Sequence, residues 1–210
     1  MSGPKDPSLE PLSSWERLYH LLDPEKLPWN AGRPDPELVK LVEAGIAPKG
    51  RALDVGTGAG HDAVYLASKG FKVTAVDIAP AAIKLAQERA SGAGVEESFE
   101  FWTGNVLDAD WPAGRFSFIN DRGFFHYLRG SERSVYVSLL ARLLAQGGLI
   151  LLRVFSDKEP PCLGPLRYSQ DELKAALDDV FSFEGLKESV FEGPAKAKSL
   201  IALLKKRPSP

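Results

Sequence analysis

Between residues 51 and 155 the chain alternates apolar runs with amphipathic stretches. Apolar runs of strand length lie at 52–55, 72–77, 98–104, 116–121 and 149–155. Residues with helical spacing fill the intervals and predict helices over about 61–69, 80–91 and 131–145. The first runs are apolar at nearly every position, which is typical of strands buried on both faces of a parallel sheet. This part of the chain is therefore predicted to form a parallel sheet with helices between its strands.

The flanking segments predict further helices. After Ser13, aromatic and aliphatic residues recur at helical spacing, and Glu16 three positions later completes the pattern of a capping box. A second short helix is expected from Pro36 to Gly45, because proline suits a first helical turn and glycine a helix end. Ser169 is expected to cap the last helix.

The C-terminal part of the chain predicts an antiparallel edge. The runs 183–192 and 198–206 are separated by Gly193-Pro194 and read as a closing hairpin. The expected fold is α/β, a doubly wound, mostly parallel, seven-stranded Rossmann-like sheet with an antiparallel C-terminal hairpin at its edge.

The domain organisation follows from the same pattern. The polar, proline-rich residues 1–12 are expected to be disordered. Residues 13–48 are expected to form a helical lid or cap, and 49–207 the Rossmann-like domain, so that the chain is a single domain overall.

The composition of the chain limits the classes of partner that it is expected to bind. The formal net charge of −2 gives no electrostatic reason to expect nucleic acid as a partner. Cys162 is the sole cysteine, so neither an intrachain disulfide nor a thiolate metal cluster is available. No apolar run is long enough to span a membrane, and the start is not that of a secretory signal, so a cytoplasmic protein is expected.

A glycine-rich turn follows the first predicted strand. Its order is Gly56-Thr57-Gly58-Ala59-Gly60, directly before His61. Dinucleotide sites use the spacing G-x-G-x-x-G, whose third glycine permits close contact between helix and strand. Here the third glycine comes one position early and His61 takes its place. A turn of this kind favours close approach of a ligand but not a dinucleotide.

Two acids frame this turn. Asp54 lies two residues before Gly56, and Asp77 ends the second predicted strand. A carboxylate at Asp54 would repel a pyrophosphate and attract an ammonium group. Asp77 is placed to accept ribose hydroxyls. The predicted ligand is therefore a nucleoside that carries positive charge and no phosphate, a description that S-adenosyl-L-methionine fits.

These motifs resemble a known family. The sequence DVGTGAG followed by Asp77 resembles the signature of class I S-adenosylmethionine-dependent methyltransferases. More narrowly, PWNAGRP, DRGFFH and QGGLILL resemble the branch of small-molecule enzymes that includes thiopurine, thiol, halide and tellurite-resistance methyltransferases. The resemblance covers residues 27 to about 155 with motifs and the remainder only by the order of strands and helices.

The resemblance implies a set of cofactor contacts. Asp54 and the backbone of Gly56, Thr57, Gly58 and Gly60 would hold the methionine moiety, and Asp77 the ribose. Ile78 would lie against the adenine, Asn105 would accept a bond from its amino group, and Val106 would support the base. Asp121 would lie beside the reacting methyl group, and S-adenosyl-L-homocysteine would be the product.

The acceptor side of the site is less specified. His126 could act as a general base or simply line the pocket. Trp29 could stack on the sulfonium or on a substrate, or anchor the leader helix in the core. Arg122 could pair with an acidic substrate, but an internal salt bridge with a neighbouring acid is favoured. The histidines lack ligand-spaced partners, so no metal site is expected.

The predicted activity is methyl transfer to a small-molecule acceptor. Amino-group methyltransferases carry an Asn/Asp-Pro-Pro-aromatic motif where this chain has Asn120-Asp121-Arg122-Gly123, which argues against nucleic-acid bases and glutamine as substrates. A thiol, a halide or a chalcogen oxyanion needs no strong base. A non-catalytic S-adenosylmethionine-binding module and an NAD-linked oxidoreductase are the alternatives. The pattern specifies neither the acceptor nor the oligomeric state.

Overall fold

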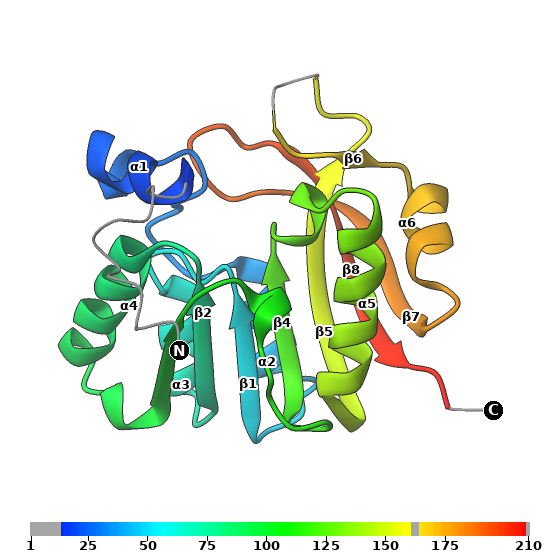
Figure 1. The fold of residues 1–210 in the computed structure, drawn as a ribbon, viewed down its shortest axis with the longest axis horizontal. Helices are drawn as coiled ribbons and strands as arrows, with labels where there is room; N and C mark the ends of the chain where they lie inside the picture. The colour runs from blue at the N-terminus through cyan, green and yellow to red at the C-terminus, as the bar shows by residue number, and fades with distance from the viewer. Residues whose placement is uncertain (1–13, 161–163, 209–210) are drawn as a thin grey trace, which may run out of the picture.

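The computed structural model describes residues 14–160 and 164–208, which form one α/β sheet structure (Figure 1). The sheet has eight strands in the order β3-β2-β1-β4-β5-β8-β7, with β6 paired to β5 outside this path. Strands β1 to β5 pair with one another in parallel, and β8 is antiparallel to both β5 and β7. The predicted parallel sheet with an antiparallel hairpin at its edge is therefore confirmed.

The strands have the following bounds: β1 Arg51–Val55, β2 Lys72–Asp77, β3 Phe99–Thr103, β4 Phe116–Arg122, β5 Leu144–Ser156, β6 Arg167–Tyr168, β7 Phe181–Val190 and β8 Lys198–Lys206. The α-helices are α1 Ser14–Leu21, α2 Pro36–Glu43, α3 His61–Ser68, α4 Pro80–Gly92, α5 Ser131–Leu143 and α6 Gln170–Leu177. Single 3₁₀ turns lie at η2 Pro24–Lys26, η3 Glu96–Ser98, η4 Val106–Asp108 and η5 Phe125–Tyr127.

Apolar cores lie on the two faces of the sheet. One core joins α5 and α6 to β-strand residues such as Leu53, Ile119 and Leu152. The other joins α2 and α3 to the neighbouring strand residues Ala52 and Phe118, which point the opposite way. Burial on both faces explains why the strands are apolar at nearly every position. None of the described helices combines the length and the apolar character that crossing a bilayer would need.

Two helix starts follow the predicted chemistry. The Asp35 carboxylate accepts the Glu37 N–H at 2.9 Å, and Pro36 occupies the first turn of α2. Ser169 and Glu172 form a reciprocal capping box at α6. The box predicted for the first helix depends on Ser13, which lies outside the described residues, as do residues 1–12 and Cys162.

The structure corrects the sheet in two places. Strand β5 begins at Leu144, earlier than predicted, because the register shifts where Phe116 pairs with Leu144 and Phe118 with Leu149. The extra residues include Gly147 at φ +75° and form an irregular stretch in the strand. Strand β6 was not predicted, since two residues carry no periodicity.

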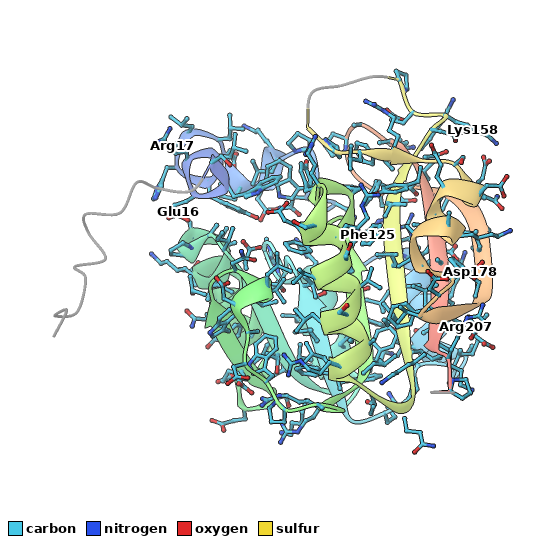
Figure 2. All side chains as sticks on the ribbon, turned by 45° about the vertical axis from the view of Figure 1, so that its right-hand side comes forward. Glu16, Arg17, Phe125, Lys158, Asp178 and Arg207 are labelled. Carbon is cyan, nitrogen blue, oxygen red and sulfur yellow. The ribbon has the colours of Figure 1, made fainter. Side chains whose placement is uncertain are left out.

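Two segments lie over the carboxyl ends of the parallel strands. Figure 1 shows α1 and the loop between β7 and β8 above this edge of the sheet. The Glu16 carboxylate accepts the Ala81 N–H of α4 at 3.0 Å, which ties α1 down, whereas Arg17 lies on the outer side of α1 (Figure 2). The loop after β7 lies close to residues 14–48, which we call the leader. A Cβ on Gly193 would lie 2.7 Å from the Pro28 carbonyl oxygen.

Substitution of Gly60, at the end of the glycine turn, is expected to change stability measurably. Its φ is +78°, and a Cβ there would lie 2.8 Å from the Ala86 Cβ. We expect Gly60→Ala to lower the free energy of unfolding by about 2–4 kcal/mol, from backbone strain and overpacking together. The matched control is Gly92→Ala in α4, where a Cβ meets nothing within 4 Å. We expect it to leave stability unchanged or raise it by about 0.5–1 kcal/mol in urea denaturation; equal losses in both variants would contradict this account.

Candidate active site

A cavity of about 660 Å³ lies at the carboxyl ends of the strands. Its polar half is formed by the ends of β1, β2 and β3 and includes Asp54, Asp77 and Asn105. Its aromatic half is formed from the leader, the ends of β4 and β5 and the loop after β7. We define the aromatic half by the side chains of Trp15, Trp29, Phe124, Tyr127, Phe155 and Phe191.

The predicted glycine turn forms the floor of the polar half. Gly56, Gly58 and Gly60 all have positive φ, at +64°, +54° and +78°. The turn is tied to the next strand, because the Gly58 N–H donates to Asp77 Oδ2 at 2.9 Å and the Thr57 N–H to the carbonyl oxygen at the end of β2. All of these residues line the cavity, so the structure brings the predicted turn and acid together.

Asp54 lies beneath this turn and is buried. Thr57 Oγ1 donates to its Oδ2 at 2.6 Å, and Asn120 Nδ2 donates to its Oδ1 at 2.7 Å. Burial, reinforced by the nearby Asp62 carboxylate, raises the pKa of Asp54 to about 7, although the two hydrogen bonds oppose the shift. A positively charged group in the cavity would favour its ionised form.

Asp54 is the end of a buried charge network. Arg153 Nη2 lies 2.8 Å from Asp35 Oδ1, and Arg122 Nε lies 3.3 Å from Asp35 Oδ2. The Asp35 N–H donates to Asp62 Oδ1 at 2.7 Å, and Arg122 Nη1 lies 3.9 Å from Asp62 Oδ2. The predicted internal salt bridge of Arg122 is confirmed. We call this set the buried network; it consists of Asp35, Asp54, Asp62, Asn120, Arg122 and Arg153.

The acid at the end of β2 is also in place. Asp77 Oδ1 accepts the Ala79 N–H at 2.9 Å, and Oδ2 accepts from Gly58. Burial raises the pKa of Asp77, and these backbone bonds oppose the rise. The next residue, Ile78, lines the cavity with 43% of its surface exposed. An apolar side chain this exposed beside a cavity is available to cover a ligand.

Asn105 and Val106 line the same half. Asn105 Oδ1 accepts the Leu107 N–H at 3.1 Å and so caps the turn η4. An amide oxygen has a second lone pair, so the predicted bond to a base stays a prediction. Val106 is buried against the core and contributes to the cavity wall.

Asp121 does not reach the cavity, contrary to its predicted position. The prediction placed it beside the reacting group, but its carboxylate is fully buried and does not belong to the cavity lining. It accepts the Phe124 N–H at 2.7 Å and the Tyr136 hydroxyl at 2.9 Å. Phe125, also fully buried, donates to the same carboxylate and packs beside α5 (Figure 2). Asp121 therefore organises the turn after β4 from behind the cavity wall.

His126 takes the second of its two expected roles, because it lines the cavity and forms a hydrogen bond with the backbone. The ring lines the cavity and is only 3% exposed. Its Nδ1 accepts the Phe155 N–H at 3.1 Å, and burial lowers the pKa of the ring to about 3. A neutral imidazole has a single lone pair on its nitrogens, and here the backbone occupies it. The predicted general base is therefore unsuited to take a proton from a ligand.

Trp29 packs against the first helix and also lies at the cavity surface. It lines the cavity and also packs edge-on against Trp15 of α1, with ring centroids 5.3 Å apart. Its Nε1 donates to the Tyr19 hydroxyl at 3.4 Å, and Trp15 packs in turn on Tyr127 at 4.9 Å. The leader thus joins the aromatic half through a chain of rings.

Some lining residues were not singled out from the sequence. Phe155 and Phe191 lie at the ends of β5 and β7, and nothing local marks them as cavity residues. His61 also lines the cavity, with Nε2 buried and unpartnered among the described residues. Burial lowers the pKa of His61 to about 4. Within the described ranges no group of three acids, histidines or cysteines is arranged to hold a metal ion.

Comparison with known proteins finds relatives over most of the chain. Residues 12–206 match the model of the family described as thiopurine S-methyltransferase. A 2-heptyl-1-hydroxyquinolin-4(1H)-one methyltransferase of Mycobacteroides abscessus is 32% identical over 178 residues, 82% of this chain and 78% of its own length. A probable thiol methyltransferase of Arabidopsis thaliana is 28% identical over 195 residues, 91% of this chain and 84% of its own length.

Solved structures share the fold. One, from work on the conversion of a disulfide bond into a thioacetal group during echinomycin biosynthesis, superposes with a TM-score of 0.79 at 25% identity. The match covers 92% of this chain and 90% of that chain.

The raised pKa of Asp54 predicts a pH-dependent stability. A carboxyl group that titrates higher when folded favours the folded state least when ionised, so stability falls as pH rises from about 4 to about 7. Asp54→Asn removes this titration and keeps an oxygen for Thr57 or Asn120. Relative to the parent, we expect the variant to gain about 1 kcal/mol or more of unfolding free energy between pH 4.5 and 7.5. The exposed Asp110→Asn is the control, and a flat difference for both variants in urea titrations refutes the assignment.

Proposed function

Since the chain belongs to the thiopurine S-methyltransferase family, which uses S-adenosylmethionine to methylate small molecules, we propose that its acceptor is a flat aromatic or heteroaromatic molecule. The reactive atom would be a soft or anionic sulfur or oxygen. The aromatic half of the cavity carries this proposal, because six aromatic side chains surround the space that adjoins the polar half.

The polar half suits the cofactor. The buried network holds three carboxyl groups and two guanidinium groups, so a cation at the Asp54 end would balance the third carboxylate and favour its ionised form. Asp54 and the glycine turn would hold the amino-acid part, Asp77 the ribose, and Ile78, Asn105 and Val106 the base. When bound, S-adenosylmethionine supplies an activated methyl group on a cationic sulfur, whose bond electrons return to sulfur as the acceptor's lone pair bonds the methyl carbon.

The aromatic half suits a planar guest. Trp15, Trp29 and Tyr127 form one edge-to-face series, and Phe155 and Phe191 form another with centroids 5.1 Å apart. Aromatic faces and edges bind flat rings through offset or edge contacts, and they exclude water from the site. A single halide ion or a chalcogen oxyanion would leave most of these walls without a contact.

The site's proton chemistry supports the choice of reactive atom. Asp121 lies behind the wall and the His126 lone pair is occupied, so neither is placed to deprotonate a bound acceptor. An acceptor that arrives anionic, or that reacts through a lone pair, does not need such a base. Alignment of the reactants in a site without water then supplies the acceleration.

The two alternatives have less support. An NAD-linked oxidoreductase would need room for a pyrophosphate where Asp54 adds a buried carboxyl group. A non-catalytic binding module would not need an aromatic chamber next to the cofactor cleft. The enzyme assignment agrees with the activity in the names of the relatives.

The cofactor placement predicts a binding loss. We expect Asp77→Ala to weaken S-adenosylhomocysteine binding tenfold or more in calorimetric titration, because a buried charged hydrogen bond is worth about 1.5–3 kcal/mol. Asp110→Ala, which removes an exposed carboxylate nearby, should bind within about twofold of the parent. Thermal unfolding of both variants checks that the fold is kept. Equal affinities for parent and Asp77→Ala would disprove the ribose placement.

The acceptor class predicts a rank order. We expect S-adenosylhomocysteine to form from 2-heptyl-1-hydroxyquinolin-4(1H)-one and from benzenethiol with kcat/KM at least about tenfold above that for thiocyanate. Filling the aromatic half with a guest that contacts its walls is the physical reason. Thiocyanate turnover equal to or faster than that of both aromatic acceptors would refute the proposal.

A further inference from the structure

One polar group in the aromatic half has no assigned task. His126 is surrounded by the rings of Tyr127, Phe155 and Phe191, with centroid distances of 4.9, 4.8 and 5.8 Å. Its Nδ1 is used by the backbone, but Nε2 has no hydrogen-bond partner among residues 14–160 and 164–208. The ring is only 3% exposed, but Nε2 is not among the fully buried atoms that lack a partner, so this nitrogen is open to the cavity that the ring lines.

The hydrogen bond at Nδ1 fixes where the ring proton is. The Phe155 N–H is a donor, so Nδ1 must offer its lone pair, and the single proton of a neutral imidazole is then on Nε2. Burial keeps the ring neutral by lowering its pKa to about 3. His126 therefore presents an N–H donor of fixed tautomer, held by three aromatic neighbours.

The same edge of the ring is left open by a glycine. A Cβ on Gly123 would lie 3.3 Å from His126 Cε1 and 3.4 Å from Nε2, so a side chain at 123 would cover the donor. Gly123 has φ +102° and lines the cavity together with His126. The Cε1–Nε2 edge thus faces the cavity across a residue that has no side chain.

The neighbouring polar groups already take part in protein hydrogen bonds. The Tyr19 hydroxyl accepts from Trp29, and the Arg122 guanidinium bonds to Asp35 and to the Glu192 carbonyl oxygen. The His126 Nε2–H is a donor on the described wall that no protein group uses. Its position among aromatic rings means that a hydrogen bond there is little weakened by water.

We infer that His126 Nε2–H binds the acceptor directly and selects planar molecules that carry a hydrogen-bond-accepting oxygen or sulfur. This inference depends on the proposed function for the identity of the guest, but not for the tautomer. The favoured acceptors have a carbonyl, thione or deprotonated hydroxyl group, and the bond orients the ring plane between the aromatic walls. His126 takes no proton in the reaction; it stabilises negative charge on the acceptor before transfer, and so acts through binding and orientation.

Two substitutions separate the donor from the internal bond. In His126→Asn the amide oxygen replaces Nδ1 as the acceptor for Phe155, but no donor reaches the position of Nε2. In His126→Gln the amide nitrogen reaches that position. We expect kcat/KM for the hydroxyquinolone to fall tenfold or more in His126→Asn and to recover at least threefold in His126→Gln relative to His126→Asn. Affinity for S-adenosylhomocysteine should stay within about twofold in both, because His126 is not part of the polar half.

The tautomer is measured without turnover. The nitrogen-15 NMR spectrum of histidine-labelled protein shows the rings of three histidines. The signals that disappear in His126→Asn belong to His126. We expect protonated-type Nε2 and unprotonated-type Nδ1 signals that do not change from pH 5 to 8. Addition of the hydroxyquinolone to protein saturated with S-adenosylhomocysteine should shift the Nε2–H proton.

The outcomes are distinguishable. A proton on Nδ1, titration of the ring between pH 5 and 8, an unmoved Nε2–H signal on addition of the acceptor, or full activity of His126→Asn each overturns the inference. Absence of turnover by the parent with a shifted Nε2–H signal supports the donor and refutes the proposed function for this acceptor. A selective loss in His126→Asn with the predicted tautomer supports both.

Discussion

The structure depends on the buried network that joins Asp35, Arg122 and Arg153 behind the cavity. Its members come from the start of α2, the end of β4 and the middle of β5, so it fixes three distant segments against one another. Removing one partner of a buried ion pair costs about 3–5 kcal/mol, because the other charge is left without compensation. The network therefore holds the leader against the sheet and also sets the sign of charge at the floor of the site. Stability and the charge of the cavity floor come from the same side chains.

The two halves of the cavity have different origins. The polar half is built from consecutive elements, the β1 end, the glycine turn and the β2 end, and backbone N–H groups at Gly58 and Ala79 hold its acid in place. The aromatic half is assembled from segments far apart in the chain, which meet only once the sheet has formed. The polar half therefore depends on local structure and the aromatic half on long-range structure.

The sequence predicted the polar half of the cavity better than the aromatic half. The sheet, the glycine turn, Asp54 and Asp77 were predicted correctly in position, since they depend on periodicity and on spacing along one stretch. Asp121 and His126 were predicted to lie near the site, but their roles could not be derived. Those roles depend on Tyr136 and on the Phe155 N–H, which come from α5 and β5. Phe191 was not anticipated for the same reason, because only the antiparallel hairpin brings it over the cavity.

The contact between Gly193 and Pro28 has an evolutionary consequence. The roof of the site is made where the leader meets the loop after β7, and the Arg33–Glu192 ion pair lies at the same junction. A substitution in either segment changes the fit of the other, so the two segments are expected to change together during evolution while the glycine turn stays constant. New acceptors would then be acquired by paired changes in these two segments, without any change in the polar half of the cavity.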